Sequence, residues 1–274
     1  MTKSQRSKLR KAVVILVVVA TVACGGSVAS PTPPILHPAP SASTTPTSSE
    51  PTPTPSPTAT PNATAHPLVY AAIGASETVG VGSAQPPQDA WPAVFLGMAL
   101  PMGTEYHNFG ISGERTAGAI TDELPGALAV HPTVVTIWLN VNDLIAQVSV
   151  ADYQTELQTL VHALRQGGAA KVLVANTPYL DRLPLYLACR GGAGAAGCSQ
   201  VASLPGPDVV NSEVAAYNAA IASVTSTEGA ILVDLHADGE VPDLHPQWVS
   251  ADGFHPSTAG YVQVAGRFAA AYRG

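Results

Sequence analysis

The feature that most limits how this chain can fold is a series of short, mostly apolar runs that alternate with longer segments of helical periodicity. Five runs read as strands, over residues 68–74, 105–110, 133–140, 171–178 and 230–235. Apolar strands that are separated by helices are typical of a parallel sheet covered on both faces. The sequence therefore predicts an α/β fold, a three-layer α/β/α sandwich with a central, mainly parallel sheet.

Helices are predicted over residues 91–100, 116–130, 150–168, 209–226 and 257–274, with a break at Pro125 in the second of these. In the third, apolar side chains recur on one face of the helix, at Tyr153, Leu157, Leu160, Val161 and Leu164. Gly167 is expected to end this helix. Residues 178–210 carry no pattern that can be converted into a structure.

Polar residues and glycines gather in the loops at one edge of the predicted sheet. Ser76 follows the first strand, and a second group precedes the last helix. The full set is Ser76, Gly110, Ser112, Gly113, Asn140, Asn142, Asp143, Asp252 and His255. Because binding sites in parallel sheets lie outside the carboxyl ends of the strands, these loops are expected to form one site.

The N-terminal part has a different composition. Residues 1–23 combine a start with five basic residues and a short apolar run, which is typical of a secretory signal peptide. The run ends in TVAC, which resembles the lipobox of bacterial lipoproteins and predicts lipidation of Cys24, with ordinary cleavage nearby as the alternative. Residues 24–66 are rich in Pro, Thr and Ser and are expected to form a disordered linker. One domain is then expected over residues 67–274.

The charge balance is acidic, with 12 Lys and Arg against 19 Asp and Glu. Removal of the five basic leader residues leaves 7 against 19. Such a chain is not expected to bind nucleic acid, nor to dock on anionic lipid, so contact with the membrane is expected only through the lipid anchor.

Two cysteines remain in the predicted domain. Cys189 and Cys198 flank the sequence RGGAGAAG. Export permits disulfides, and we predict that these two pair and close a Gly/Ala-rich loop. Two free thiols are the alternative.

Four short blocks in the expected site loops resemble the sequence blocks of the SGNH, or GDSL, hydrolases. They are GASETVG (74–80), NFGISG (108–113), WLNVNDL (138–144) and DGFHPSTAGY (252–261). The blocks occur in the family's order and span nearly the whole predicted domain. The resemblance implies the three-layer sandwich of that family and a serine hydrolase.

Carried over position by position, the resemblance implies a role for each site residue. Ser76 is the nucleophile, His255 is the general base and then the general acid, and Asp252 orients His255. A histidine is needed because a serine hydroxyl does not ionise near pH 7. The oxyanion hole is expected to consist of the backbone N–H groups of Ser76 and Gly110 and the side chain of Asn142. Asp143 is expected to brace the Asn142 loop.

Two positions depart from the family's blocks. Ala75 stands where Asp is usual. We expect little loss of catalytic activity from this change, because that Asp is neither the nucleophile nor the base. Asn140 stands where Gly is usual, and its side chain is expected to narrow the pocket, which favours a short aliphatic or acetyl ester.

Two rival readings concern histidines and acids near the C-terminus. His245 in DLHPQW competes with His255 for the role of base, but its spacing from the preceding Asp is two rather than three, and no helical pattern follows it. A loose group of acids and histidines comprises Asp234, His236, Asp238, Asp243 and His245. It lacks the spacing of a zinc site, so neither a metal nor a cofactor is expected.

The sequence thus predicts an exported serine hydrolase that cleaves carboxylic esters through a Ser76 acyl-enzyme. It is expected to act as a monomer on the outer side of the cell membrane, lipid-anchored or secreted, on a small-molecule or glycan-linked ester. A cell-envelope polysaccharide O-deacetylase or acyltransferase is the alternative enzyme. A tethered binding module without turnover is the alternative of another class.

Overall fold

The computed structural model describes residues 68–190, 198, 204–237, 239 and 241–274. The predicted signal peptide, Cys24 and the predicted linker lie outside the described residues, as does Asp238. Within the described part of the chain, no helix is both long and apolar enough to cross a membrane.

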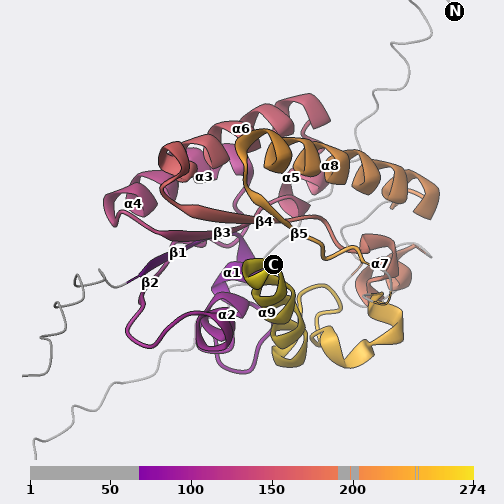
Figure 1. The fold of residues 1–274 in the computed structure, drawn as a ribbon. Coiled ribbons are helices and arrows are strands. Elements are labelled where there is room, and N and C mark those ends of the chain that lie inside the picture. Colours follow the sequence, from indigo (N-terminus) through magenta and orange to yellow (C-terminus); the bar gives the residue numbers. More distant parts are fainter. Residues whose placement is uncertain (1–67, 191–197, 199–203, 238, 240) are drawn as a thin grey trace, which may run out of the picture. The chain divides into compact units, whose positions relative to one another are not determined.

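A five-stranded parallel sheet forms the centre of the domain (Figure 1). Its strands lie in the order β2-β1-β3-β4-β5. Their bounds are β1 (Val69–Gly74), β2 (Glu105–Asn108), β3 (Val134–Trp138), β4 (Lys171–Ala175) and β5 (Ile231–Val233). The predicted α/β fold with a parallel sheet is confirmed.

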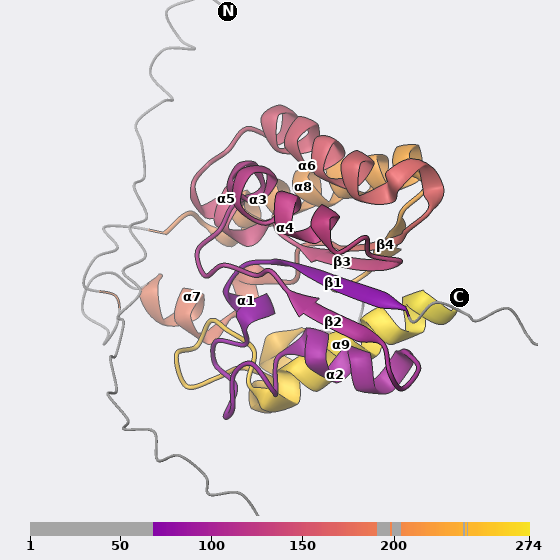
Figure 2. The ribbon, with the colours of Figure 1, turned by 90° about the vertical axis from the view of Figure 1, so that its left-hand side faces the viewer.

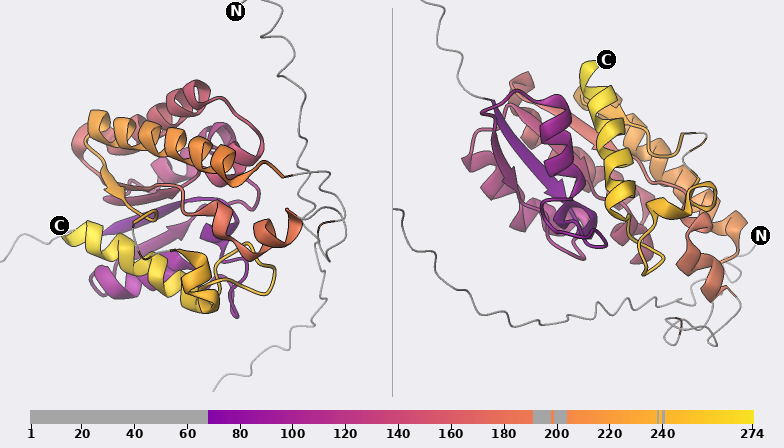
Figure 3. Two further views of the ribbon diagram at one scale, coloured as in Figure 1. Left: turned by 90° about the vertical axis from the view of Figure 1, so that its right-hand side faces the viewer. Right: turned by 90° about the horizontal axis from the view of Figure 1, so that it is seen from below.

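Helices cover both faces of the sheet (Figures 1 and 2). On one face lie α3 (Thr116–Asp122), α4 (Leu124–Ala129), α6 (Val150–Arg165) and α8 (Pro207–Glu228), and on the other lie α2 (Trp91–Ala99) and α9 (Thr258–Arg273). Figure 3 shows α8 and α9 on opposite sides of the strands. Because successive side chains of a strand face opposite ways, Ala71 and Ile73 pack in the first core and Tyr70 and Ala72 in the second.

The amphipathic pattern over residues 150–168 forms α6 as predicted, and the five apolar residues of its face are buried. Ser149 caps its start by accepting a hydrogen bond from the Asp152 amide at 3.1 Å. The helix ends at Arg165, because Gln166 already adopts left-handed backbone angles (φ 48°), one residue before the expected Gly167. The predicted break near Pro125 is also confirmed, with Pro125 in the first turn of α4.

Several short helices were not predicted. They are α1 (Ser76–Val79), α5 (Val141–Ile145), α7 (Pro184–Cys189) and the 3₁₀ turns η2 (Leu180–Arg182), η3 (Pro242–Leu244) and η4 (Pro246–Trp248). A further 3₁₀ turn, η1 (Gln166–Gly168), lies within the segment predicted as the helix 150–168. Most of them follow the carboxyl end of a strand or lie in the segment before α9. A segment of three to six residues is too short to show a helical period, so the sequence pattern could not reveal them.

The order of the strands determines where a crevice can form. The chain moves outward from β1 to β2 on one side and from β3 to β5 on the other, so the order reverses between β1 and β3. Gly74 at the end of β1 pairs with Trp138 at the end of β3. The loops after these two strands therefore begin side by side, at the point where parallel sheets bind their ligands.

The predicted disulfide is present, with Cys189 at the end of α7 bonded to Cys198 and 5.3 Å between their Cα atoms. The bond joins residues nine positions apart. The chain-entropy relation gives a loop of this size roughly 2–3 kcal/mol of stabilisation.

We expect the Cys189→Ala/Cys198→Ala variant to lose about this much free energy of unfolding in urea titrations. Reduction should lower the stability of the wild type and leave the variant unchanged, and equal stabilities would contradict the prediction.

Candidate active site

Ser76 is the first residue of α1, directly beyond the carboxyl end of β1. Ala75 is the N-cap of this short helix and offers no side-chain cap. The end of β1 is anchored by a hydrogen bond: the Gly74 amide donates to the buried Glu123 carboxyl group at 2.9 Å. The Ser76 carbonyl in turn accepts from the amides of Gly80 and Val81 at 3.0 Å each. Ser76 is thereby fixed at the edge of the sheet.

The structure brings Ser76, His255 and Asp252 together, although Ser76 and His255 are 179 positions apart. His255 Nε2 lies 3.0 Å from Ser76 Oγ, and His255 Nδ1 lies 2.6 Å from Asp252 Oδ2. A carboxylate can only accept, so the proton of the neutral imidazole sits on Nδ1. Nε2 is then the free acceptor for the Ser76 hydroxyl, which is the arrangement that a general base requires.

The loop before α9 holds Asp252 as a carboxylate. Its Oδ1 accepts from the amides of Phe254 and His255 at 2.8 and 2.9 Å and from the Ser250 hydroxyl at 2.7 Å. Partial burial would raise the pKa of Asp252, but the hydrogen bonds from His255, Phe254 and Ser250 outweigh it and hold this pKa well below its usual range.

The environment of His255 favours its charged form. Burial would lower the pKa of His255, but the hydrogen bond to Asp252 and the negative charge of Glu77 outweigh it, so this pKa is raised above 6.5. The imidazolium that forms when His255 takes a proton is therefore stabilised.

The rival histidines lie elsewhere. His245 contacts the Gly239 carbonyl at 3.0 Å and stacks on Trp248, with 3.7 Å between the ring centroids. His236 contacts the Thr177 carbonyl at 3.0 Å and stacks on Tyr179. Of the histidines in the described part of the chain, His255 is the one in hydrogen-bond contact with Ser76.

The expected role of Gly110 needs a correction. Its amide already donates to Asn108 Oδ1 at 2.9 Å, so it is not free to bind an oxyanion. A glycine is required at 110 for packing instead, because a Cβ there would lie 2.8 Å from the Thr78 methyl group. Gly113 differs from Gly110, since its amide has no acceptor within the described residues, its φ is +82° and a Cβ would meet open space.

Asn142 lies in α5, which begins three residues beyond β3. Its Nδ2 donates to the Glu114 carbonyl at 2.9 Å, which ties its side chain to the residue after Gly113 and leaves its second N–H available. The next residue, Asp143, is fully buried and accepts from the Thr116 amide and hydroxyl at 3.2 and 3.1 Å. Burial raises the pKa of Asp143 to about 6, although the bonds from Thr116 oppose this shift. These bonds suit the expected bracing role of Asp143.

Asn140 is buried in extended backbone (φ −169°), so its position does not require glycine. Its Nδ2 donates to the Ala175 carbonyl at 3.2 Å. Asn140 lines a small recess with Ala75, Glu77, Trp138, Val141 and Asn142. The side chain of Asn140 thus occupies space beside Asn142.

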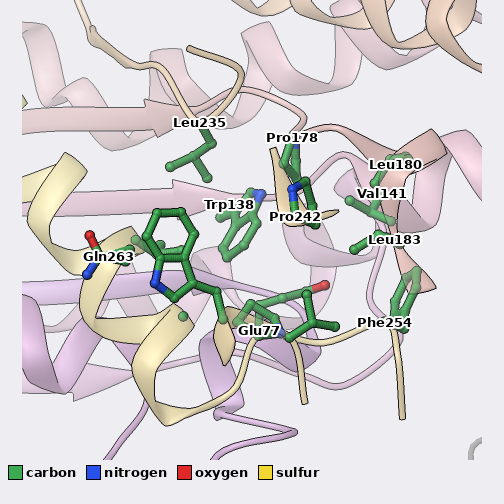
Figure 4. A pocket seen from close by; sticks show the side chains of 15 residues that line it. Glu77, Trp138, Val141, Pro178, Leu180, Leu183, Leu235, Pro242, Phe254 and Gln263 are labelled. Atoms are coloured by element: carbon green, nitrogen blue, oxygen red, sulfur yellow. The ribbon is translucent and has the colours of Figure 1, made fainter. Parts of the chain in front are cut away.

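A mostly apolar cavity of about 100 Å³ adjoins this recess (Figure 4). Glu77, Trp138 and Val141 line both hollows. Phe254 and Pro256, which flank His255 in the sequence, line the cavity as well. Sequence reasoning missed both Glu77 and Glu123. Only the position of Glu77 directly after Ser76 could have drawn attention to it.

No group of three or more His, Cys, Asp or Glu side chains in the described residues is placed to hold a metal ion. Of the loose acidic cluster, Asp234 binds the Asn176 side chain at 2.7 Å and Asp243 contacts Arg182 at 3.3 Å. These residues are used in bonds within the fold.

The contacts among Ser76, His255 and Asp252 are those that a hydrolase with a serine nucleophile requires. The profile of the GDSL-like lipase/acylhydrolase family matches residues 72–263. The chain belongs to this family, which confirms the resemblance of its four blocks. No curated protein matches the chain.

Solved structures share the fold. The lipase/acylhydrolase of Enterococcus faecalis is 19% identical, with a TM-score of 0.54, over 74% of this chain and 94% of that one. The extracellular lipase of Streptomyces rimosus is 20% identical, with a TM-score of 0.52, over 73% and 98%. The psychrotrophic esterase EstA of a Pseudoalteromonas species is 16% identical, with a TM-score of 0.54, over 75% and 96%.

Proposed function

We propose that this protein hydrolyses carboxylic esters through an acyl-enzyme on Ser76. The observation that carries the proposal is the continuous relay from Ser76 Oγ to His255 and Asp252, at 3.0 and 2.6 Å. Ser76 Oγ attacks the ester carbonyl carbon while its proton passes to His255 Nε2. Asp252 fixes the imidazole ring and stabilises the imidazolium.

The tetrahedral intermediate carries a negative charge on the former carbonyl oxygen, which needs hydrogen-bond donors. We assign this role to the Ser76 amide, to the second N–H of Asn142 and to the Gly113 amide. The hydrogen bond from Asn142 to the carbonyl of Glu114, the residue after Gly113, supports the assignment of the last two donors to one site. Gly113 takes the place that the sequence had given to Gly110.

Collapse of the intermediate breaks the bond to the leaving alcohol, which takes the proton from His255 Nε2. Water then enters, gives a proton to the same nitrogen and attacks the acyl carbon. Release of the carboxylic acid returns the proton to Ser76 Oγ. Every proton transfer uses one histidine, so no cofactor is required.

We infer the site of action from the N-terminal sequence. The signal-type leader and the lipobox-like TVAC would place the domain on the outer side of the cell membrane, on a linker of roughly 40 residues. A small-molecule or glycan-linked ester is then the substrate class. The intact relay favours turnover over a tethered binding module, because binding alone needs no proton acceptor at Ser76.

The test compares the purified wild type with Ser76→Ala. We expect the wild type to hydrolyse p-nitrophenyl esters, with a preference for short chains, and to react stoichiometrically with an alkyl fluorophosphonate, which mass spectrometry should locate on Ser76. The variant should lose both properties and still fold, by circular dichroism. Ser223→Ala, an exposed position on α8, is the matched control. Hydrolysis that survives in Ser76→Ala would refute the acyl-enzyme.

A further inference from the structure

Glu77 is a buried carboxylate beside the proposed nucleophile. The residue is 8% exposed. The Ser76 hydroxyl lies 3.3 Å from Glu77 Oε2, so Glu77 is a second acceptor for the hydroxyl that must donate to His255. Among the described residues, no Lys or Arg forms an ion pair with Glu77. The cation that the described residues supply near Glu77 is the imidazolium of His255, which exists only while His255 holds a second proton.

The surroundings of Glu77 are aromatic and apolar. Glu77 and Trp138 line both the cavity and the recess that contains Asn142, so they lie between the proposed oxyanion site and the apolar space. Trp248 contributes a further aromatic ring to the cavity wall. Phe254 contributes another (Figure 4). Gln263 is the other polar side chain in the lining.

Three physical arguments follow from this placement. A buried carboxylate without a permanently charged partner is destabilising unless a ligand pairs with it. Aromatic faces attract cations, and a carboxylate beside them completes a site for an ammonium group. In addition, a negative charge near Ser76 opposes the growth of negative charge on the substrate oxygen. A cation on the substrate would offset that opposition.

We propose that Glu77, with Trp138 and Trp248, selects esters that carry an ammonium group close to the scissile bond. This inference rests on the proposed ester hydrolysis and names its substrate class. The negative net charge of the chain, −7, also favours the approach of cationic substrates over anionic ones.

The first experiment measures kcat/KM for two matched pairs of esters. Acetylcholine and its uncharged isostere 3,3-dimethylbutyl acetate place the charge on the alcohol. The p-nitrophenyl esters of betaine and of 3,3-dimethylbutyric acid place it on the acyl group. The charged-to-neutral ratio is compared between wild type and Glu77→Gln, which cancels the intrinsic reactivity of each ester.

We expect the ratio for at least one pair to fall about tenfold or more in Glu77→Gln. Glu213→Gln, an exposed position on α8 with the same change of charge, should leave both ratios unchanged. If Glu77 acted only through the charge state of His255, both esters of a pair would slow equally and neither ratio would move. Unchanged ratios in both pairs would overturn the inference while leaving ester hydrolysis intact.

A second experiment measures binding without turnover. Choline and 3,3-dimethylbutanol are titrated into Ser76→Ala while the tryptophan fluorescence is followed. Choline should bind more tightly than 3,3-dimethylbutanol. In the double variant Ser76→Ala/Glu77→Gln, the two affinities should become equal. Choline binding without hydrolysis of any ester would contradict the proposed function but support the cation site. Equal binding of the two probes would overturn the cation site.

Discussion

Replacement of His255 with alanine is expected to lower kcat for ester hydrolysis by roughly 10⁴-fold or more. The physical reason is that Ser76 Oγ has one imidazole acceptor, His255 Nε2 at 3.0 Å, and a serine hydroxyl does not lose its proton near neutral pH without one. Because the pKa of His255 is raised above 6.5, the wild-type kcat/KM should rise as pH increases through that pKa and the imidazole becomes neutral. The residual kcat/KM of His255→Ala should not show this rise with pH.

Two comparisons make the result specific. His245→Ala removes the rival histidine of the sequence DLHPQW, and we expect it to change kcat by less than about tenfold. The double variant Ser76→Ala/His255→Ala should be no slower than either single variant, because the two residues act as a unit. Additive losses, or a larger loss in His245→Ala than in His255→Ala, would show that the relay is wrongly assigned.

The free energy of unfolding is expected to decrease as the pH rises from 5 to 8, because of Glu123. This residue is fully buried between α3 and α4, and no partner within the described residues bonds its Oε1. Burial raises the pKa of Glu123 to about 8 from 4.5, although the hydrogen bond from the Gly74 amide opposes the shift.

The sign follows from proton linkage. Above pH 4.5 the unfolded chain releases the Glu123 proton, whereas the folded chain keeps it until about pH 8. The folded state binds more protons in this range, so the free energy of unfolding decreases as pH rises. The loss from this one group is on the order of 3 kcal/mol between pH 5 and pH 8.

Glu123→Gln should remove that contribution, because an amide does not titrate and its oxygen can still accept from the Gly74 amide. Urea unfolding at several pH values should give a shallower decline for Glu123→Gln than for the wild type. Glu213→Gln should keep the wild-type slope, since its side chain is exposed. Parallel curves for wild type and Glu123→Gln would show that the carboxyl group is ionised in the folded state.

Much of the architecture could be predicted from the sequence because it depends on local periodicity. The apolar runs became the five strands, and the apolar face of residues 150–168 became the buried face of α6. The first predicted strand ended at Gly74, as β1 does, but the other four were too long at their carboxyl ends. For example, β3 ends at Trp138 rather than Asn140, because the backbone turns there to form the site.

The candidate residues Ser76, Asn142, Asp252 and His255 were found from the spacing of motifs and from their places in the loops. Motif spacing could not show that Gly110 packs on Thr78 while its amide binds Asn108, because that depends on how the loop folds back against α1. Nor could it show that Glu123 holds Gly74, since the two are 49 positions apart.

The sequence by itself determined the layers of the sandwich and the edge of the sheet where its polar loops gather. The reason is that the apolar periodicity of a strand or helix depends only on residues close together in the sequence. Only the tertiary structure decided which glycine amide stays free, and that Glu77 lines a mostly apolar cavity with aromatic rings in its wall. These properties are set by contacts between segments distant in the chain, and the burial and hydrogen bonding of a side chain exist only once those segments have packed.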